Sequence, residues 1–219
     1  MVPASSLWQE TRTFFPIFLD LVDVRQLKSV CVVGASDGKF VLPLARRGVH
    51  VLAVERNKTA LDGGPVVLPG PTEATMRGLR QRLADEGLSG QVEIVEADIL
   101  DLPDELDAVD AVWTSCSWHY SINHRRPLAD FITAMKHLCR PHGGLFGAEY
   151  MMPVAPRHLA CEHYPEEGEM RRFFPDWEID WEAYTPPFRE APHVEQLHEH
   201  THRMGLLIAT HLQEGCNAD

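Results

Sequence analysis

Hydrophobic residues along the chain follow two periodicities, and their order predicts the fold. Continuous apolar runs, typical of strands buried on both faces, occur at residues 29–34, 49–55, 92–96, 108–114 and 144–150. Helical spacing of apolar residues predicts helices over residues 39–47, 72–86 and 127–138. Because strands and helices alternate, we expect an α/β protein built on a doubly wound, mostly parallel sheet.

The two ends of the chain depart from this alternation. Apolar residues at three- and four-residue spacing predict an amphipathic helix over residues 5–24. We expect residues 1–27 to form a lid helix over the site and residues 28–219 to form the main domain. Near the C-terminus, alternating residues 177–184 and the apolar run 203–211 follow one another without a predicted helix. They predict an antiparallel hairpin at one edge of a seven-stranded sheet.

Composition narrows the class of protein. The chain has 20 Lys and Arg against 32 Asp and Glu, a net charge of −12, so nucleic acid and anionic membrane surfaces are not expected partners. The 5 cysteines are odd in number and form no C-x-x-C pair, which argues against a disulfide framework or a zinc knuckle. The N-terminus lacks the pattern of a signal peptide. We expect a cytoplasmic protein, monomeric or homodimeric, that acts on a small molecule.

Polar and glycine residues stand at the ends of the first three predicted strands. The sequence GASDG follows the first strand and opens a helix, so its backbone can turn tightly and approach a ligand. Glu55 ends the second strand, where a carboxylate can accept hydrogen bonds from ribose hydroxyls. Asp98 and Ile99 follow the third strand and suit an adenine ring. Together they favour a nucleoside-containing cofactor, although each alone also fits a tight turn or a solvated carboxylate.

With these motifs the chain resembles the class I S-adenosylmethionine-dependent methyltransferases, particularly small single-domain members of the tellurite-resistance and thiopurine kind. The family's elements appear in order as VVGASDG, VLAVE, EADILDLP, VDAVWTSCSWHYS and CRPHGGLFGAEY. The resemblance implies a Rossmann-like fold and S-adenosyl-L-methionine as the cofactor. It implies these cofactor-binding residues: Gly34, Ala35, Ser36, Asp37, Gly38, Glu55, Arg56, Asp98, Ile99 and Ser115.

Two positions depart from the family pattern. Val32 stands where the family usually carries an acidic residue, and Ser36 replaces the usual second glycine. Asp37 is the candidate substitute for the missing carboxylate. A nicotinamide dehydrogenase is disfavoured, because the turn lacks the G-x-G-x-x-G arrangement.

The substrate side is predicted after the fourth strand, where ligands of open α/β sheets bind. Aromatic and histidine residues gather there: Trp113, Trp118, His119, Tyr120 and His124. His119 is the candidate general base, with Tyr120 beside it and Glu149, at the end of the fifth strand before Tyr150, as a further catalytic candidate. Residues 158–174 are expected to form a second lid that brings Glu162, His163 and Tyr164 to the substrate.

A histidine-rich stretch comes late in the chain, with His193, His198, His200 and His202. An H-x-H-x-H pattern on a strand places three imidazoles on one face, which is one way to bind a metal ion. Methyl transfer to nitrogen or oxygen needs no metal, so we predict no metal, and the pattern also fits a hairpin strand with at least one of these histidines at the substrate rim.

The sequence therefore predicts an S-adenosylmethionine-dependent methyltransferase that acts on a nitrogen or oxygen nucleophile of a small molecule. An amine- or guanidine-bearing compound or a natural product is the expected acceptor. The alternatives are other adenosine-linked chemistry on the same fold, a protein substrate, or a non-catalytic binding protein.

Overall fold

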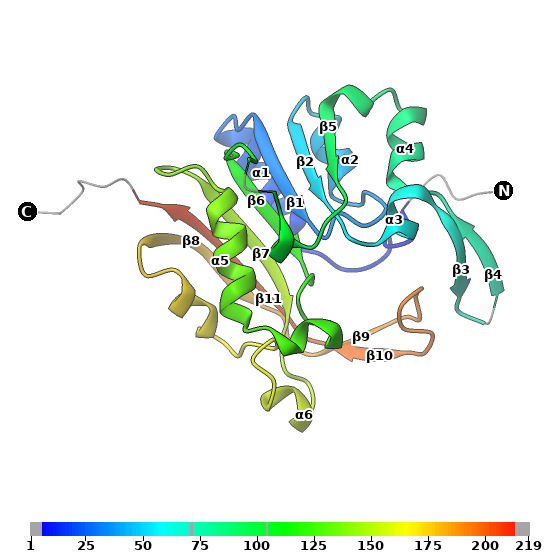
Figure 1. Cartoon of the computed structure of the whole chain (residues 1–219). Coiled ribbons are helices and arrows are strands. Elements are labelled where there is room, and N and C mark those ends of the chain that lie inside the picture. The colour runs from blue at the N-terminus through cyan, green and yellow to red at the C-terminus, as the bar shows by residue number, and fades with distance from the viewer. Residues whose placement is uncertain (1–5, 71, 104, 213–219) are drawn as a thin grey trace, which may run out of the picture.

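A seven-stranded sheet runs through the centre of the protein (Figure 1). The structure is a computed structural model, and it describes residues 6–70, 72–103 and 105–212. Strand β11 runs antiparallel to both of its neighbours. All other neighbouring strands in this sheet pair in parallel. In sheet order the strands are β5 (Val92–Val95), β2 (His50–Val54), β1 (Ser29–Val33), β6 (Ala111–Ser115), β7 (Leu145–Met151), β11 (Met204–His211) and β8 (Trp177–Tyr184). The predicted fold class is confirmed.

Helices cover both faces of the sheet, because alternate side chains of each strand point to opposite faces. Val30 and Val32 face a core that includes residues of α1, α2 and α4, whereas Cys31 and Val33 face a second core under α5. The helices are α1 (Phe15–Val24), α2 (Val41–Ala45), α3 (Lys58–Asp62), α4 (Leu79–Asp85), α5 (Leu128–Leu138) and α6 (Pro156–Leu159). None of the helices in the described part of the chain is long and apolar enough to cross a bilayer.

The N-terminal helix is shorter than predicted and belongs to the core. Helix α1 begins at Phe15, with Pro16 in its first turn, where proline is favoured. Its Phe15 and Phe18 rings lie 5.2 and 4.8 Å from the ring of Trp113 in strand β6. Residues 6–14 are not helical, and it is this segment, rather than α1, that reaches the pocket described below. Residue 5, where the predicted helix begins, lies outside the described residues.

The region predicted as one helix over residues 72–86 divides in two. Strands β3 (Gly64–Leu68) and β4 (Thr72–Met76) form an antiparallel hairpin that projects from the body of the protein (Figure 1), and only α4 is helical. Gly78, between the hairpin and α4, packs directly against the backbone of Gly63, where a side chain would overlap it. Both hairpin strands contain β-branched residues, which favour strands over helix, so residues 72–76 form β4 and not the start of the predicted helix.

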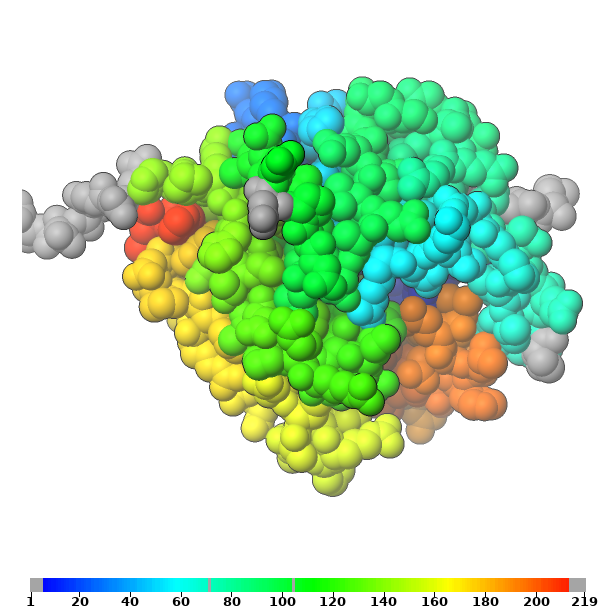
Figure 2. Space-filling model, in the orientation of Figure 1, coloured from blue at the N-terminus to red at the C-terminus, as the bar shows by residue number. Residues whose placement is uncertain are grey.

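The chain between β7 and β11 builds one side of the pocket described below. It contains α6, the 3₁₀ turn η4 (Glu169–Phe173), strand β8, and a second small hairpin of β9 (Phe188–Glu190) and β10 (His200–His202). Three further 3₁₀ turns are η1 (Ser89–Gln91), η2 (Ile99–Asp101) and η3 (Ser121–Arg125). Figure 2 shows the β9–β10 hairpin in orange below the cyan segment near residue 60, with a recess between them in which the blue N-terminal segment is visible.

Candidate active site

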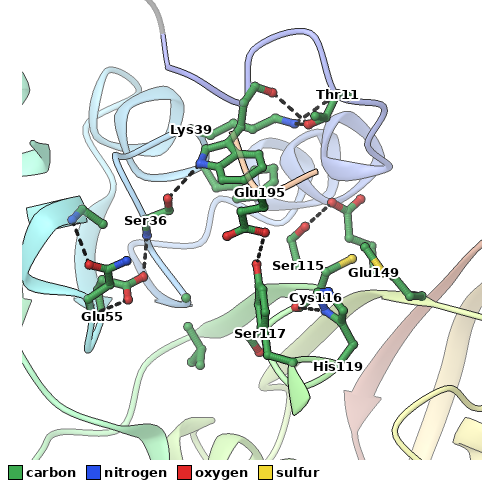
Figure 3. A pocket seen from close by; sticks show the side chains of 18 of the residues that line it. Thr11, Ser36, Lys39, Glu55, Ser115, Cys116, Ser117, His119, Glu149 and Glu195 are labelled. Carbon is green, nitrogen blue, oxygen red and sulfur yellow. Dashed lines mark hydrogen bonds between the residues drawn. The ribbon is translucent and has the colours of Figure 1, made fainter. Parts of the chain in front are cut away.

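A pocket of about 360 Å³ lies at the carboxyl ends of β1, β2 and β6, between the glycine turn and the β9–β10 hairpin. Its size falls within the range of small-molecule sites, and its position matches the usual ligand crevice of an open α/β sheet. Chain segments far apart in sequence contribute, and Figure 3 shows side chains from several of them pointing into one space. The predicted residues that line it are Gly34, Ser36, Glu55, Arg56, Asp98, Ile99, Ser115, His119, Tyr120 and Glu149.

The glycine turn brings backbone directly to the pocket. Gly34 has φ +75°, and a Cβ there would lie 3.1 Å from the Cβ of Ser117, so any side chain would be strained and crowded. Ser36 adopts a left-handed φ of 47°. Its amide donates to Glu55 Oε2 at 2.8 Å, and its hydroxyl accepts from Trp8 Nε1 at 3.1 Å. The turn after β1 is therefore tied both to the end of β2 and to the N-terminal segment.

Ala35, Asp37 and Gly38 are not among the described residues that line this pocket. The buried Asp37 carboxylate instead accepts from the Ser6 hydroxyl at 2.5 Å and the Leu7 amide at 2.8 Å, and it lies 3.3 Å from Arg82 Nη1. Asp37 thus holds the N-terminal segment, and its role as substitute for the carboxylate missing at Val32 stays a prediction. Gly38 has φ +96°, which a residue with a side chain rarely adopts, and a Cβ there would also overlap the end of the Leu42 side chain.

Three charged residues surround the part of the pocket beyond β2. Glu55 Oε1 accepts from the Asn57 amide at 2.7 Å, which leaves lone pairs free on both of its oxygens. Arg56 Nη1 pairs with Asp98 Oδ2 at 2.7 Å and also donates to Asn123 Oδ1 at 3.2 Å. Asp98 is thereby fixed at the pocket wall, next to the buried side chain of Ile99.

His119 has one ring nitrogen fixed by the backbone. Its Nδ1 contacts the carbonyl oxygen of Cys116, and because a carbonyl only accepts, Nδ1 carries the proton and Nε2 has a free lone pair. Burial lowers the pKa of His119 to about 4, so the ring is neutral at neutral pH. The neighbouring Tyr120 ring lies 4.2 Å away, and its hydroxyl donates to Glu195 Oε2 at 2.6 Å.

Glu149 is buried in the pocket wall and fully engaged with the protein. Its Oε2 accepts from Thr13 Oγ1 and from the Phe14 amide, both at 2.7 Å, and its Oε1 accepts from the Ser115 hydroxyl. Burial raises the pKa of this carboxyl, while the three hydrogen bonds act against that shift. Glu149 therefore fastens the start of α1 to strands β6 and β7, and a catalytic role for it stays a prediction.

Several predicted substrate residues lie elsewhere. Trp113 and Trp118 are completely buried in the two cores, Trp118 stacking on Tyr150 with ring centroids 6.2 Å apart. Both rings pack in the cores and are not among the described residues that line the pocket. His124, Tyr150, Glu162, His163 and Tyr164 are likewise not among the described pocket-lining residues.

Other residues line the pocket, and apart from the N-terminal segment, which was expected to cover the site, they were not predicted. The N-terminal segment contributes Trp8, Thr11 and Arg12, the glycine turn is followed by Lys39, and the late hairpin region contributes Phe188, Glu190, Glu195 and Met204. Lys39 Nζ donates to the Thr11 hydroxyl at 2.5 Å and its carbonyl at 3.1 Å, and burial lowers the pKa of the ammonium group. Of the late histidines, His193 and His202 line the pocket and His198 is exposed.

Comparison with known proteins identifies the family. A family model for a methyltransferase domain matches residues 31–147, just over half of the chain. The chain belongs to this family. The predicted resemblance to class I S-adenosylmethionine-dependent methyltransferases is confirmed, and the matched residues hold the glycine turn, Glu55, Asp98 and His119.

Individual proteins illustrate what the chain is similar to. A ubiquinone/menaquinone biosynthesis C-methyltransferase of Pseudomonas fluorescens (strain SBW25) is 30% identical over 121 residues, which cover 55% of this chain and 45% of that protein. The match thus spans less than half of that relative's length. TehB from Haemophilus influenzae superposes with a TM-score of 0.67 at 14% identity, over 93% of this chain and 64% of that one.

A ligand-bound methyltransferase shares the same fold. The 1,6-didemethyltoxoflavin-N1-methyltransferase of Burkholderia thailandensis, solved with 1,6-didemethyltoxoflavin and S-adenosylhomocysteine, gives a TM-score of 0.59 at 15% identity, over 94% of this chain and 81% of that one. At such identities the likeness concerns the fold alone.

Proposed function

We propose that this methyltransferase binds S-adenosyl-L-methionine in the pocket and transfers its methyl group to a nitrogen or oxygen atom of a small molecule. Family membership supports the reaction class. The observation that carries the proposal is His119, whose unprotonated Nε2 belongs to a residue of the pocket wall at the end of β6. When bound, S-adenosyl-L-methionine supplies an electrophilic methyl group on a positively charged sulfur.

The residues present fit this cofactor. Glu55 keeps free lone pairs on both oxygens, so it can accept from two ribose hydroxyls while it still holds Ser36 and Asn57. Asp98 and Ile99 offer an acceptor and an apolar surface for adenine. Gly34 leaves room for the methionine portion, because no side chain stands between the turn and the pocket.

His119 then acts on the acceptor. A neutral imidazole with its Nδ1 proton held by Cys116 can take the proton that an amine or hydroxyl nucleophile loses on methylation. Desolvation around His119 keeps the ring neutral and ready to accept. The rest of the pocket orients the acceptor, which converts an encounter in solution into a reaction between held groups.

The charge of the pocket favours an acceptor with an amine or guanidine group. The described lining residues include the carboxylates of Glu55, Asp98, Glu149, Glu190 and Glu195 and the basic groups of Arg12, Lys39 and Arg56. Aromatic faces at Trp8, Tyr120 and Phe188 attract cations as well. The Burkholderia enzyme, which is by its name an N1-methyltransferase, is a precedent for a nitrogen acceptor on this fold. A small-molecule acceptor, a cytoplasmic location and a monomer or homodimer remain parts of the proposal.

Labelled methyl transfer tests this function. The protein is incubated with methyl-labelled S-adenosyl-L-methionine and a fractionated small-molecule extract, and labelled products are identified by mass spectrometry. We expect a labelled N- or O-methyl compound with the wild type and at least about a 100-fold smaller yield with His119→Ala. Label only in protein fractions contradicts the small-molecule proposal. No label in any fraction, despite measurable cofactor binding, favours a binding protein.

A further inference from the structure

The β9–β10 hairpin gathers three histidines and one glutamate. In the antiparallel pairing His200 lies opposite Glu190, and His202, two residues further along β10, lies on the same face as His200. His193 follows β9 and is held by two backbone hydrogen bonds with Gln196, at 2.9 and 3.1 Å. The hairpin backbone therefore fixes the positions of all four side chains.

Their potential metal-binding atoms converge on one point. The Nε2 atoms of His202, His200 and His193 lie 3.1, 3.6 and 3.8 Å from Glu190 Oε2, and all four donor atoms lie within 4.8 Å of one another. In a tetrahedral zinc site with Zn–N bonds of ~2.1 Å, ligand atoms lie ~3.4 Å apart. The three distances to Glu190 bracket that value, so small side-chain rotations suffice to bind an ion.

One ring nitrogen in this cluster, Nε2 of His200, has no hydrogen-bond partner among the described residues. His200 Nδ1 donates to the carbonyl oxygen of His198 at 2.8 Å, so the Nε2 of a neutral His200 carries a lone pair that faces the Glu190 carboxylate. That Nε2 is buried and has no hydrogen-bond partner among the described residues. The Nε2 lone pair of His200 and the Glu190 carboxylate oxygen repel each other unless a cation lies between them. An Nδ1–H bonded to a carbonyl is also the usual support of a metal-bound imidazole.

We propose that Glu190, His193, His200 and His202 form a binding site for a divalent transition-metal ion of the zinc type. Three imidazoles and one carboxylate are donors that such borderline ions prefer, and they suit Mg²⁺ or Ca²⁺ poorly. Side chains of low exposure, 10 to 15% for these four, keep water from competing for the ion.

The site borders the pocket, which gives the ion a role. Glu190, His193 and His202 line the same pocket as Glu55 and His119. Zinc can expand to a fifth ligand, so the ion can bind the nucleophilic heteroatom of the acceptor and lower its pKa. This role rests on the proposed function, whereas the existence of the site does not. This proposal departs from the sequence-based expectation of no metal. The proposed ligands also differ from the H-x-H-x-H pattern, because His198 is exposed and Glu190 and His193 complete the set.

Metal binding is tested without cofactor or acceptor. Metal-free full-length protein is titrated with Zn²⁺ by calorimetry, and retained zinc is measured after desalting. We expect one zinc per chain at the hairpin, and at least about a 100-fold loss of affinity in both His200→Ala and Glu190→Gln. His198→Ala is the matched control on the same hairpin, and its affinity should equal that of the wild type. Equal zinc affinity in wild type and His200→Ala overturns the proposal, as does a wild type that binds no zinc.

Cobalt separates this site from adventitious binding elsewhere. Cys161 Sγ lies 3.8 Å from His163 Nδ1 and could bind zinc on its own account. A Co²⁺ complex of the hairpin site has nitrogen and oxygen ligands, so its visible absorption should appear without a thiolate charge-transfer band and should persist in Cys161→Ser. Loss of all the Co²⁺ absorption in Cys161→Ser contradicts the proposal. Calorimetry with S-adenosyl-L-methionine on the same samples shows independently whether the cofactor part of the proposed function fails.

Discussion

Replacing Glu149 distinguishes a structural anchor from a catalytic group. The carboxylate accepts from Thr13, Phe14 and Ser115, and it is only 1% exposed. In Glu149→Ala the Phe14 amide and the two hydroxyls lose their acceptor. An unsatisfied buried donor costs about 1–3 kcal/mol, and hydroxyls can turn toward other partners. We therefore expect the free energy of unfolding to fall by about 3 kcal/mol.

Glu149→Gln is the matched variant. A glutamine oxygen in place of Oε2 still accepts from Thr13 and Phe14, and the glutamine NH₂ can donate to the Ser115 oxygen, because a hydroxyl also accepts. Hydrogen bonding is thus preserved while the negative charge is removed. We expect Glu149→Gln to change stability by less than about 1 kcal/mol and to keep most of the methyl-transfer activity.

Thermal and denaturant unfolding measure the difference. For a chain of this size 1 kcal/mol corresponds to roughly 2–4 °C, so Glu149→Ala should lower the melting temperature by about 6–12 °C. Activity is measured below both transitions. If Glu149→Gln is as stable as the wild type but loses activity at least as strongly as His119→Ala, the carboxylate is a catalytic group and the anchor interpretation is wrong.

Two further variants test the pocket and its support. His119→Ala should lower kcat by about 10²- to 10⁴-fold with little change in cofactor affinity, as a lost general base requires. In the wild type the imidazole must be unprotonated to act, so burial of His119 predicts a rate that falls only as pH drops toward a pKa of about 4 and is level from pH 6 to 8. A wild-type rate that falls with a midpoint near pH 6.5, or a fall at low pH that persists in His119→Ala, refutes the assignment of His119 as the general base. Asp37→Ala should destabilise the protein by about 3–5 kcal/mol in denaturant unfolding, because the buried Arg82 guanidinium loses its partner. Cofactor affinity measured on the folded variant should be unchanged, and a large loss of affinity would return Asp37 to the binding site.

The sheet was predictable because each strand carries its own signal. The apolar runs of β1, β2 and β5 and the residues just after them place Gly34, Glu55 and Asp98 at one edge, since parallel strands share their carboxyl ends. Local signals failed where tertiary contacts decide. The apolar spacing before α1 continues back to Leu7, but Glu149 takes the Phe14 amide and Asp37 takes the Leu7 amide, so helix starts only at Phe15.

The rest of the pocket could not be predicted, because its walls come from distant segments. Trp8, Lys39 and Glu190 have no common local pattern, and only the fold brings them to one cavity. Aromatic composition after β6 was misleading, because Trp113 lies on a strand face turned toward α1. The histidine pattern predicted a rim position for part of the cluster, yet the fourth ligand candidate, Glu190, lies on the partner strand of the hairpin.

Calorimetry with S-adenosyl-L-methionine on three proteins tests the central claim most directly. The wild type should bind, and Glu55→Ala should bind at least about tenfold more weakly, because hydrogen bonds to a charged acceptor contribute about 1.5–3 kcal/mol each. Glu96→Ala is the control, since Glu96 is an exposed carboxylate just after β5, 3.6 Å from Arg80 and outside the pocket lining. Its affinity should match the wild type. A wild type that does not bind the cofactor, or a Glu55→Ala affinity within about twofold of wild type, contradicts the claim that this pocket holds it.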